Sequence, residues 1–164
     1  MGKLIITNMQ KIVPVHNEGH IGYSYDKYDV TDSKEKYEVS SPSQGNQSIV
    51  AFYSIPPGKS NYPFHFHTTN EEVFYIISGE GTLETSQGKT KVVAGDIIVC
   101  PVGEVGAHKL TNSSDTDALV YLDVDTNNTP DIVFYPHSDK VGLRMSGFSN
   151  NFILESNVDY WEGE

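Results

Sequence analysis

Short apolar runs alternate with turn residues from residue 48 onward, about every 8–12 residues, and this pattern is typical of an all-β domain. The runs are rich in aromatic and β-branched residues, which favour strands. Gly88 predicts a tight hairpin turn between two of the runs, because glycine accepts the positive φ of such turns. We predict strands over the following ranges: 48–55, 62–66, 72–78, 81–85, 89–93, 96–100, 108–112 and 118–124.

Two flanking segments, 1–47 and 125–164, lack this pattern. The first shows no helical periodicity, and we predict an irregular arm with one or two edge strands. The second is polar but carries apolar groups at 132–135, 148–154 and 160–161, without a strong helix signal. We expect this tail to pack on the outside or at one end of the strands. The alternatives are that it crosses to a partner subunit or narrows the mouth of a pocket.

Three histidines and one glutamate are the most informative side chains. His65 and His67 point to the same face of a strand, because residues two apart in a strand do so. Glu72 opens the next predicted strand, and His108 opens a later one. Three imidazoles and one carboxylate form a complete ligand set for one divalent transition metal, and zinc, manganese, iron(II), nickel and cobalt all fit. Four strands can surround one ion only if the sheet curls into a small barrel.

The residues around these four resemble the two sequence motifs of the cupin family. The first motif reads Gly58, His65, His67, Glu72 and Gly79, and the second reads Gly95, Pro101, Gly103, His108 and Asn112. Glu72 fits better than Glu71, because only Glu72 has six residues before Gly79. The segment before His65 is one residue longer than in the family motif, and the segment before His108 is two residues longer. Both differences fall in loops, where added length costs little.

The resemblance covers roughly residues 48–124 and implies a double-stranded β-helix, or jelly-roll, barrel with one metal site. It implies no particular reaction, because cupins include isomerases, dioxygenases, decarboxylases and proteins that only bind small molecules. We prefer a metal-dependent enzyme that acts on a small polar metabolite by Lewis-acid or O₂ chemistry. The alternative is a non-enzymatic protein that binds or senses a sugar-like molecule.

No general acid or base stands out in the sequence. Four side chains lie on or beside strands near the histidines: Tyr53, Tyr62, Tyr121 and Asp123. Packing is the simpler interpretation for each, so the catalytic residues stay unassigned. Cys100 ends an apolar strand and is expected to be a small core residue. His16, His20 and His137 are expected at the surface, and Asn112 is expected to make structural hydrogen bonds at a turn.

The charge balance limits the classes of partner that we expect for this chain. The chain has 22 acidic and 11 basic residues, a net charge of −11, and no basic stripe that could neutralise phosphates, so we expect no nucleic-acid partner. No apolar run resembles a signal peptide or reaches the length that spans a bilayer, so we expect no membrane association. A single cysteine fits a reducing compartment, and we expect a cytoplasmic location. Because cupins commonly pair through edge strands, we also expect a homodimer.

Overall fold

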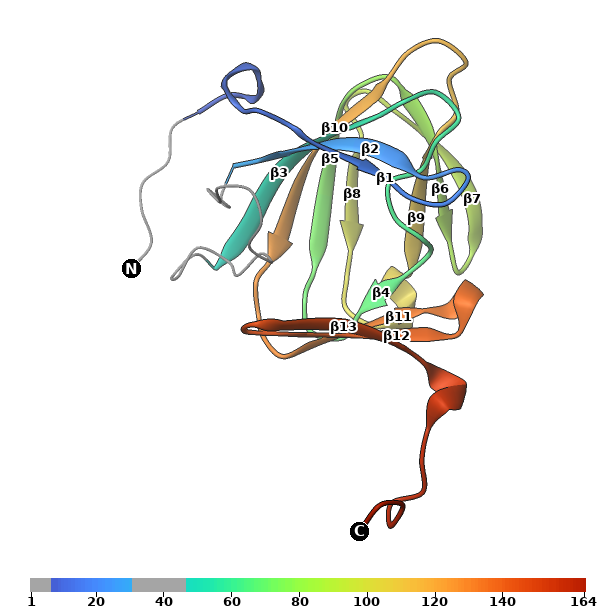
Figure 1. Ribbon diagram of the computed structural model, residues 1–164. Coiled ribbons are helices and arrows are strands. Elements are labelled where there is room, and N and C mark those ends of the chain that lie inside the picture. The colour runs from blue at the N-terminus through green and yellow to red at the C-terminus, as the bar shows by residue number, and fades with distance from the viewer. Residues whose placement is uncertain (1–6, 31–46) are drawn as a thin grey trace.

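The computed structural model describes residues 7–30 and 47–164 of the chain (Figure 1). The largest sheet within them has six strands, all antiparallel to their neighbours. In spatial order these strands are β1 (Val15–Glu18), β2 (Ser24–Asp29), β3 (Ser48–Ile55), β10 (Leu119–Thr126), β5 (Glu72–Ser78) and β8 (Ile97–Cys100). A second sheet consists of β7 (Gly88–Val93), β6 (Glu80–Thr85) and β9 (His108–Asn112).

These two sheets enclose one apolar core. Alternate residues of β3, β9 and β10 are buried, as the two-residue period of a strand with one inward face requires. Both sheets contribute to the core, which includes Ala51, Ile55, Ile76, Leu119, Val92 and Leu110. Gly79, between β5 and β6, has a φ of 83°, and a Cβ there would lie 2.5 Å from the Ala118 carbonyl oxygen. Glycine is therefore required at this bend.

A third sheet closes one end of the barrel. Its order is β13 (Phe148–Ile153), β12 (Lys140–Met145), β11 (Asp131–Tyr135) and β4 (Phe66–His67). In Figure 1 it lies across the lower ends of the long strands. Val133 of β11 points into the barrel and is only 2% exposed. The segment after residue 125 therefore provides the floor of the barrel and not only an outer cover.

Most predicted strands agree closely with the structure. Those over 48–55, 72–78 and 108–112 have the predicted bounds. The predicted strand 62–66 is wrong, because β4 contains only Phe66 and His67. Pro63 has no N–H to donate to a sheet, and residues 62–65 pair through one isolated bridge, between His65 and His108.

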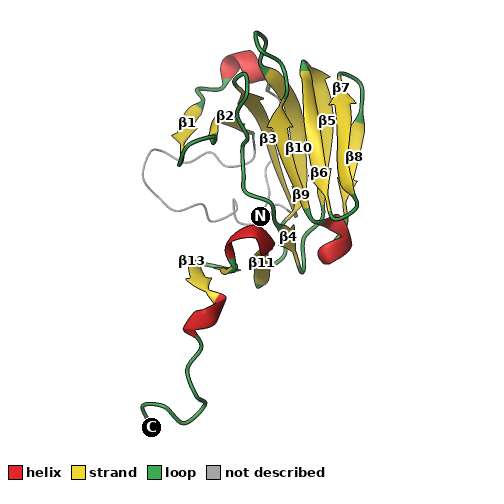
Figure 2. Cartoon of the chain, turned by 90° about the vertical axis from the view of Figure 1, so that its right-hand side faces the viewer, coloured by secondary structure: helices red, strands yellow, loops and turns green. Residues whose placement is uncertain are grey.

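The flanking segments differ in how tightly they join the barrel. Strand β2 pairs with β3, and β1 forms the outer edge of the six-stranded sheet, whereas residues 1–6 and 31–46 of the expected arm lie outside the described residues. Residues 154–164 are exposed and extend away from the barrel (Figure 2). The described short helices are η1 (Met9–Lys11), η2 (Glu104–Gly106), η3 (Pro136–Ser138) and η4 (Leu154–Ser156). No helix in these described ranges is long and apolar enough to cross a membrane.

Candidate metal centre

The structure brings the four predicted ligand residues together inside the barrel. The Glu72 carboxylate lies at the centre, 3.3 Å from His108 Nε2, 3.7 Å from His65 Nε2 and 3.8 Å from His67 Nε2. His65, His67 and Glu72 each offer a ligand atom within 4.8 Å of the others. All four residues come from different strands or from the bridge beside β4, as a closed barrel requires.

Each imidazole is oriented by a hydrogen bond from its other nitrogen. His65 Nδ1 lies 2.9 Å from the Pro63 carbonyl oxygen, and His108 Nδ1 lies 2.9 Å from the Gly106 carbonyl oxygen. A carbonyl oxygen can only accept, so both Nδ1 atoms carry the proton and donate it. The Nε2 atoms are then left with free lone pairs that face Glu72. Metal-binding histidines in proteins are held in this way.

Asp131 orients the third imidazole and was not identified from the sequence. Its Oδ2 atom accepts a hydrogen bond of 2.5 Å from His67 Nδ1, and its Oδ1 atom accepts one of 3.0 Å from the Thr69 N–H. Asp131 opens β11 and is 2% exposed. It is far from the histidines in sequence, so only the pairing of β11 with β4 could have revealed this contact.

The His67–Asp131 contact changes the pKa of both groups. Burial alone would lower the pKa of His67, but the hydrogen bond to Asp131 and the nearby Glu72 carboxylate raise it above its usual value. Burial alone would raise the pKa of Asp131, but contact with His67 lowers it. Both shifts favour the charged forms, so the pair is a strong contact when no metal competes for His67.

The surroundings of Glu72 keep it ionised. Burial opposes its charge, but contact with His65 and the charges of His108 and His67 together lower its pKa to about 2. The pKa of His108 is lowered, chiefly by burial and despite the nearby Glu72 carboxylate. The ionised Glu72 suits a divalent ion, whereas His67, whose raised pKa favours its charged form, loses its Nε2 proton when a metal binds there.

Two further carboxyl groups lie beside this cluster on β10. Asp125 is directly opposite Glu72 across the sheet, and Asp123 lies two residues earlier on the same face. Burial and the Glu72 carboxylate raise the pKa of Asp125 to about 7, while burial and the Asp125 carboxylate raise that of Asp123 well above its usual value. The Oδ1 atoms of both residues are buried and have no hydrogen-bond partner among the described residues.

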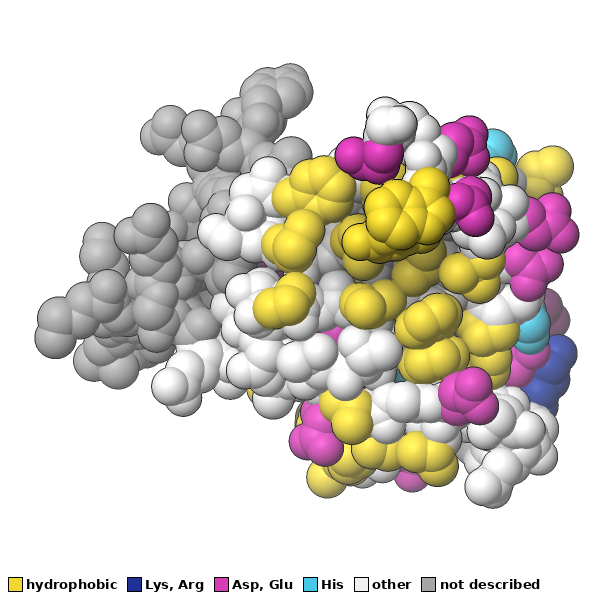
Figure 3. Space-filling view, turned by 90° about the horizontal axis from the view of Figure 1, so that it is seen from below, with side chains coloured by type: hydrophobic (Ala, Val, Ile, Leu, Met, Phe, Trp, Pro, Cys, Tyr) yellow, Lys and Arg dark blue, Asp and Glu magenta, His cyan; other side chains and the backbone are white. Residues whose placement is uncertain are grey.

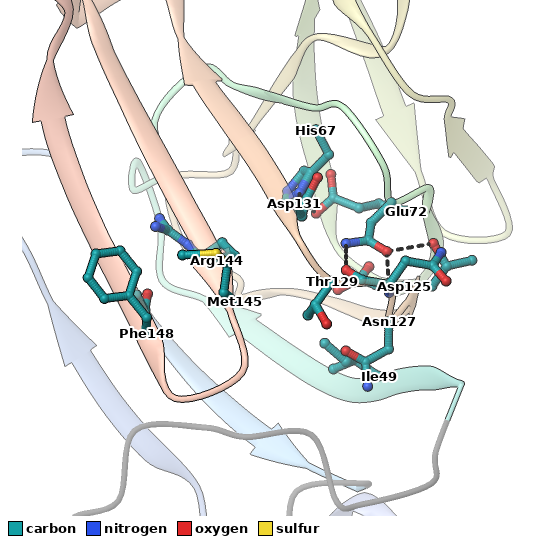
Figure 4. Close-up of a pocket in the computed structure, with 14 residues that line it drawn as sticks. Ile49, His67, Glu72, Asp125, Asn127, Thr129, Asp131, Arg144, Met145 and Phe148 are labelled. Atoms are coloured by element: carbon teal, nitrogen blue, oxygen red, sulfur yellow. Dashed lines mark hydrogen bonds and ion pairs between the residues drawn. The ribbon is translucent and has the colours of Figure 1, made fainter. Parts of the chain in front are cut away.

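A pocket of about 250 Å³ opens beside His67 and Glu72. Most of the residues that line it are polar, among them Asn70, Asp125, Asn127, Thr129, Asp131 and Arg144, and Ile49, Met145 and Phe148 add apolar surface. Figure 4 shows the β12–β13 hairpin, with Arg144, Met145 and Phe148, on the opposite side of the pocket from Glu72 and Asp125. A small polar molecule that fills this space would meet both the histidine cluster and the hairpin.

The sequence analysis also considered three tyrosines, Cys100 and Asn112, and all of these make packing contacts or hydrogen bonds that support the fold. The Tyr53 and Tyr121 rings stack with centroids 5.0 Å apart, and the Tyr62 hydroxyl lies 3.1 Å from that of Tyr53. Burial raises the pKa of all three phenols, so they stay neutral. Cys100 is a buried core residue, and burial raises the pKa of its thiol. Asn112 donates to the Ile55 and Asp117 carbonyl oxygens and holds a turn.

Comparison with known proteins agrees with this architecture. The family model for the cupin domain matches residues 51–125. An oxalate-binding protein of Thermotoga maritima is 32% identical over 69 residues, which are 42% of this chain and 54% of that protein. The chain therefore spans about half the length of this curated relative.

Two solved structures match nearly the whole fold. One, described as a putative sugar phosphate isomerase from Acidithiobacillus ferrooxidans, has a TM-score of 0.76 and 23% identity and covers 93% of this chain and 92% of its own. The other is described as a sugar phosphate isomerase of the cupin superfamily from Silicibacter pomeroyi. It has a TM-score of 0.75 and 18% identity, and the match covers 92% of this chain and 93% of that one. At these identities the likeness shows the fold alone. Residues 51–125 therefore match a cupin domain, and these solved structures share the fold of the barrel.

Proposed function

We propose that this protein is a metal-dependent enzyme that acts on a small polar metabolite, with one divalent transition metal held by His65, His67, Glu72 and His108. One observation carries the proposal: three Nε2 atoms face one buried carboxylate, while every Nδ1 atom is tied to an acceptor. A structural cluster of histidines would have no need to keep all three Nε2 atoms directed to a common point.

The donor set fits zinc, manganese, iron(II), nickel or cobalt. Three neutral imidazoles and one carboxylate leave a divalent ion with a net charge near +1, and they leave ligand positions open when the ion takes five or six ligands. Such an ion supplies Lewis-acid chemistry or an O₂ site when bound. The chain itself supplies the Asp125 carboxyl group in the same pocket, where it can accept or return a proton of the substrate.

The pocket supports a small polar substrate. Its volume of about 250 Å³ and its amide, hydroxyl and carboxylate walls suit a metabolite with several oxygens. The structural relatives described as sugar phosphate isomerases, and a third described as a predicted oxalate decarboxylase, favour an enzyme of this class. The description of the sequence relative as an oxalate-binding protein favours a second candidate, a protein that binds such a molecule without converting it.

The test is metal analysis of the protein purified without chelator, followed by the double variant His65→Ala/His67→Ala. We expect about one equivalent of metal in the wild type and none in the variant, because two of the four donors are lost. The control is His16→Ala/His20→Ala, which removes two histidines outside this cluster and should leave the metal content unchanged. Stoichiometric metal in the His65/His67 variant would contradict the proposal. Conversion of an oxygen-rich metabolite, and not binding alone, would separate the enzyme from the binding protein.

We also propose that two copies of the chain pair. The outward face of the third sheet carries an uncharged row, Phe66, Phe134, Val141 and Phe152, whose members are direct neighbours across the four strands. Hydrophobic side chains gather on this face (Figure 3), and Phe152 is 45% exposed. An uncharged face limits the repulsion between two chains of net charge −11. Light scattering on the protein as it elutes from a size-exclusion column should give twice the mass of the chain. The mass of a single chain would contradict the pairing.

A further inference from the structure

Arg144 is the only arginine of the chain, and it lines the pocket that opens beside His67 and Glu72. It lies on β12 directly opposite Asp131, yet it forms no ion pair with any carboxylate in the described ranges. Asp131 is already engaged with His67. The guanidinium is therefore a positive charge without a negative partner in a chain that has twice as many acidic as basic residues.

Neutral groups hold this guanidinium in place. Nη1 donates to the carbonyl oxygens of Leu143 and Asn150 at 3.2 and 3.1 Å. Nη2 donates to the Tyr135 hydroxyl at 3.0 Å and to Asn151 Oδ1 at 2.8 Å. These contacts fix the orientation of the side chain without neutralising it. The remaining hydrogen, on Nε, has no acceptor among the described residues.

The backbone leaves room for the guanidinium at Gly142. A Cβ at this position would lie 2.7 Å from both Nη1 and Nη2 of Arg144, so any larger residue would displace the guanidinium. Tyr135 connects it to the histidine cluster, since its ring stacks on that of His65 with centroids 6.0 Å apart. The charge is thus placed by several residues at a defined distance from the candidate metal ligands.

We propose that Arg144 pairs with an anionic group, a carboxylate or a phosphate, on the metabolite that the metal centre acts on. This inference rests on the proposed function and adds the class of substrate. A guanidinium that is partly removed from water gains from a charged oxygen partner, and its Nε hydrogen is the donor left open among the described residues. Apart from His67, Arg144 is the one basic side chain that lines the pocket. An anionic group of the substrate that does not bind the metal therefore has this guanidinium as its positive partner in the pocket.

Calorimetry on the zinc-loaded protein tests this assignment with three probes: oxalate, glucose 6-phosphate and glucose. We expect Arg144→Gln to weaken binding of an anionic probe by about 10- to 100-fold, the usual effect of losing one charge-assisted hydrogen-bonding group. Zinc content and any binding of the uncharged glucose should not change. Loss confined to oxalate identifies a carboxylate, and loss confined to glucose 6-phosphate identifies a phosphate.

Three further variants separate recognition from hairpin stability. Arg144→Lys keeps the charge but not the planar fork, and it should recover part of the lost affinity. Gly142→Ala keeps the arginine but displaces the guanidinium, and it should weaken anion binding without changing glucose binding. Asn151→Ala removes one neutral contact of the hairpin and should have a small effect on all probes. If Arg144→Gln does not fold, Gly142→Ala and Arg144→Lys decide the question.

The inference is overturned if anion binding is the same in Arg144→Gln and Gly142→Ala as in the wild type, or if glucose binding falls by the same factor. It is also overturned if the zinc-loaded wild type binds neither anion at millimolar concentrations. If the proposed function itself is wrong, the result is distinguishable, because the wild-type protein would then hold no zinc at all.

Discussion

Glu72 and Asp125 face each other across β5 and β10, yet the pKa values of their carboxyl groups shift in opposite directions. That of Glu72 falls to about 2, and that of Asp125 rises to about 7. Both side chains lose contact with water, and burial raises the pKa of both. The difference is that Glu72 faces His65, His67 and His108, whereas the Glu72 carboxylate is the neighbour that raises the pKa of Asp125.

Burial therefore keeps the pKa of Asp125 high, whereas the three histidines overcome the same effect at Glu72. In one part of the barrel interior three imidazoles surround the Glu72 carboxylate. In the adjacent part Asp123 and Asp125 lie together, and no ion pair joins them to a cation of the described residues. A divalent ion among the histidines would supply positive charge to both parts and would lower the pKa of Asp125 as well. Metal binding and the state of the acidic pair are thus coupled.

The largest effect is expected when the charge of Glu72 is removed. Glu72→Gln keeps the shape of the side chain but deprives the metal of its one anionic donor. We expect the affinity for zinc to fall by more than the roughly 10- to 100-fold that loss of an outer partner costs. Competition with a chromophoric chelator measures the affinity. An affinity equal to that of the wild type would show that the carboxylate does not contact the metal.

A smaller effect is expected from Asp131→Asn, which keeps a hydrogen-bond acceptor at His67 but removes its charge. We expect the affinity for zinc to fall by about 10- to 100-fold, because the imidazole becomes less basic and less firmly oriented. The matched control is Asp26→Asn, since Asp26 makes a similar contact of 2.7 Å with Nδ1 of the exposed His16. The control should leave zinc affinity unchanged, and an equal loss in both variants would point to a general electrostatic effect.

The smallest effect is a change in how stability depends on pH in the metal-free protein. The raised pKa of Asp125 means that the folded state holds its proton more tightly than the unfolded state. Its contribution is therefore present near pH 4 and is lost as the pH rises through about 7. Asp125→Asn should remove this loss, so its free energy of unfolding should exceed that of the wild type at pH 8 by about 1–3 kcal/mol.

For Glu72, the contribution to the free energy of unfolding depends on pH in the opposite direction. Its pKa is lowered from 4.5 to about 2, so its contribution is present above pH 4.5 and is lost as the pH falls through about 2. Denaturant unfolding of Glu72→Gln, Asp125→Asn and the wild type between about pH 2 and pH 8 measures the two slopes. An Asp125→Asn variant that follows the wild-type curve at alkaline pH would contradict the assigned shift.

Local sequence signals were sufficient for the barrel and for the four clustered side chains. Runs of β-branched and aromatic residues gave the bounds of β3, β5 and β9, because strand propensity and the two-residue period act over a few neighbours. His65 and His67 were recognised by their spacing. Their strand was misjudged, because Pro63 and the turn before β4 limit pairing to two residues.

The third sheet could not be recognised in the same way. Its strands contain Gly142, Asn150 and Asn151, which have low strand propensity, and they form because β11 pairs with β4 and carries β12 and β13 with it. Such pairing between distant segments leaves no local periodicity.

The sequence alone therefore determined the fold class, the strand pattern of the barrel and the residue types of the candidate metal centre. Only the tertiary structure decided that Asp131 orients His67, that Asp125 lies against Glu72 and that Arg144 faces the same pocket. These three contacts depend on which distant strands are neighbours. Strand neighbours are selected by the packing of the whole barrel, and no short stretch of residues encodes that choice.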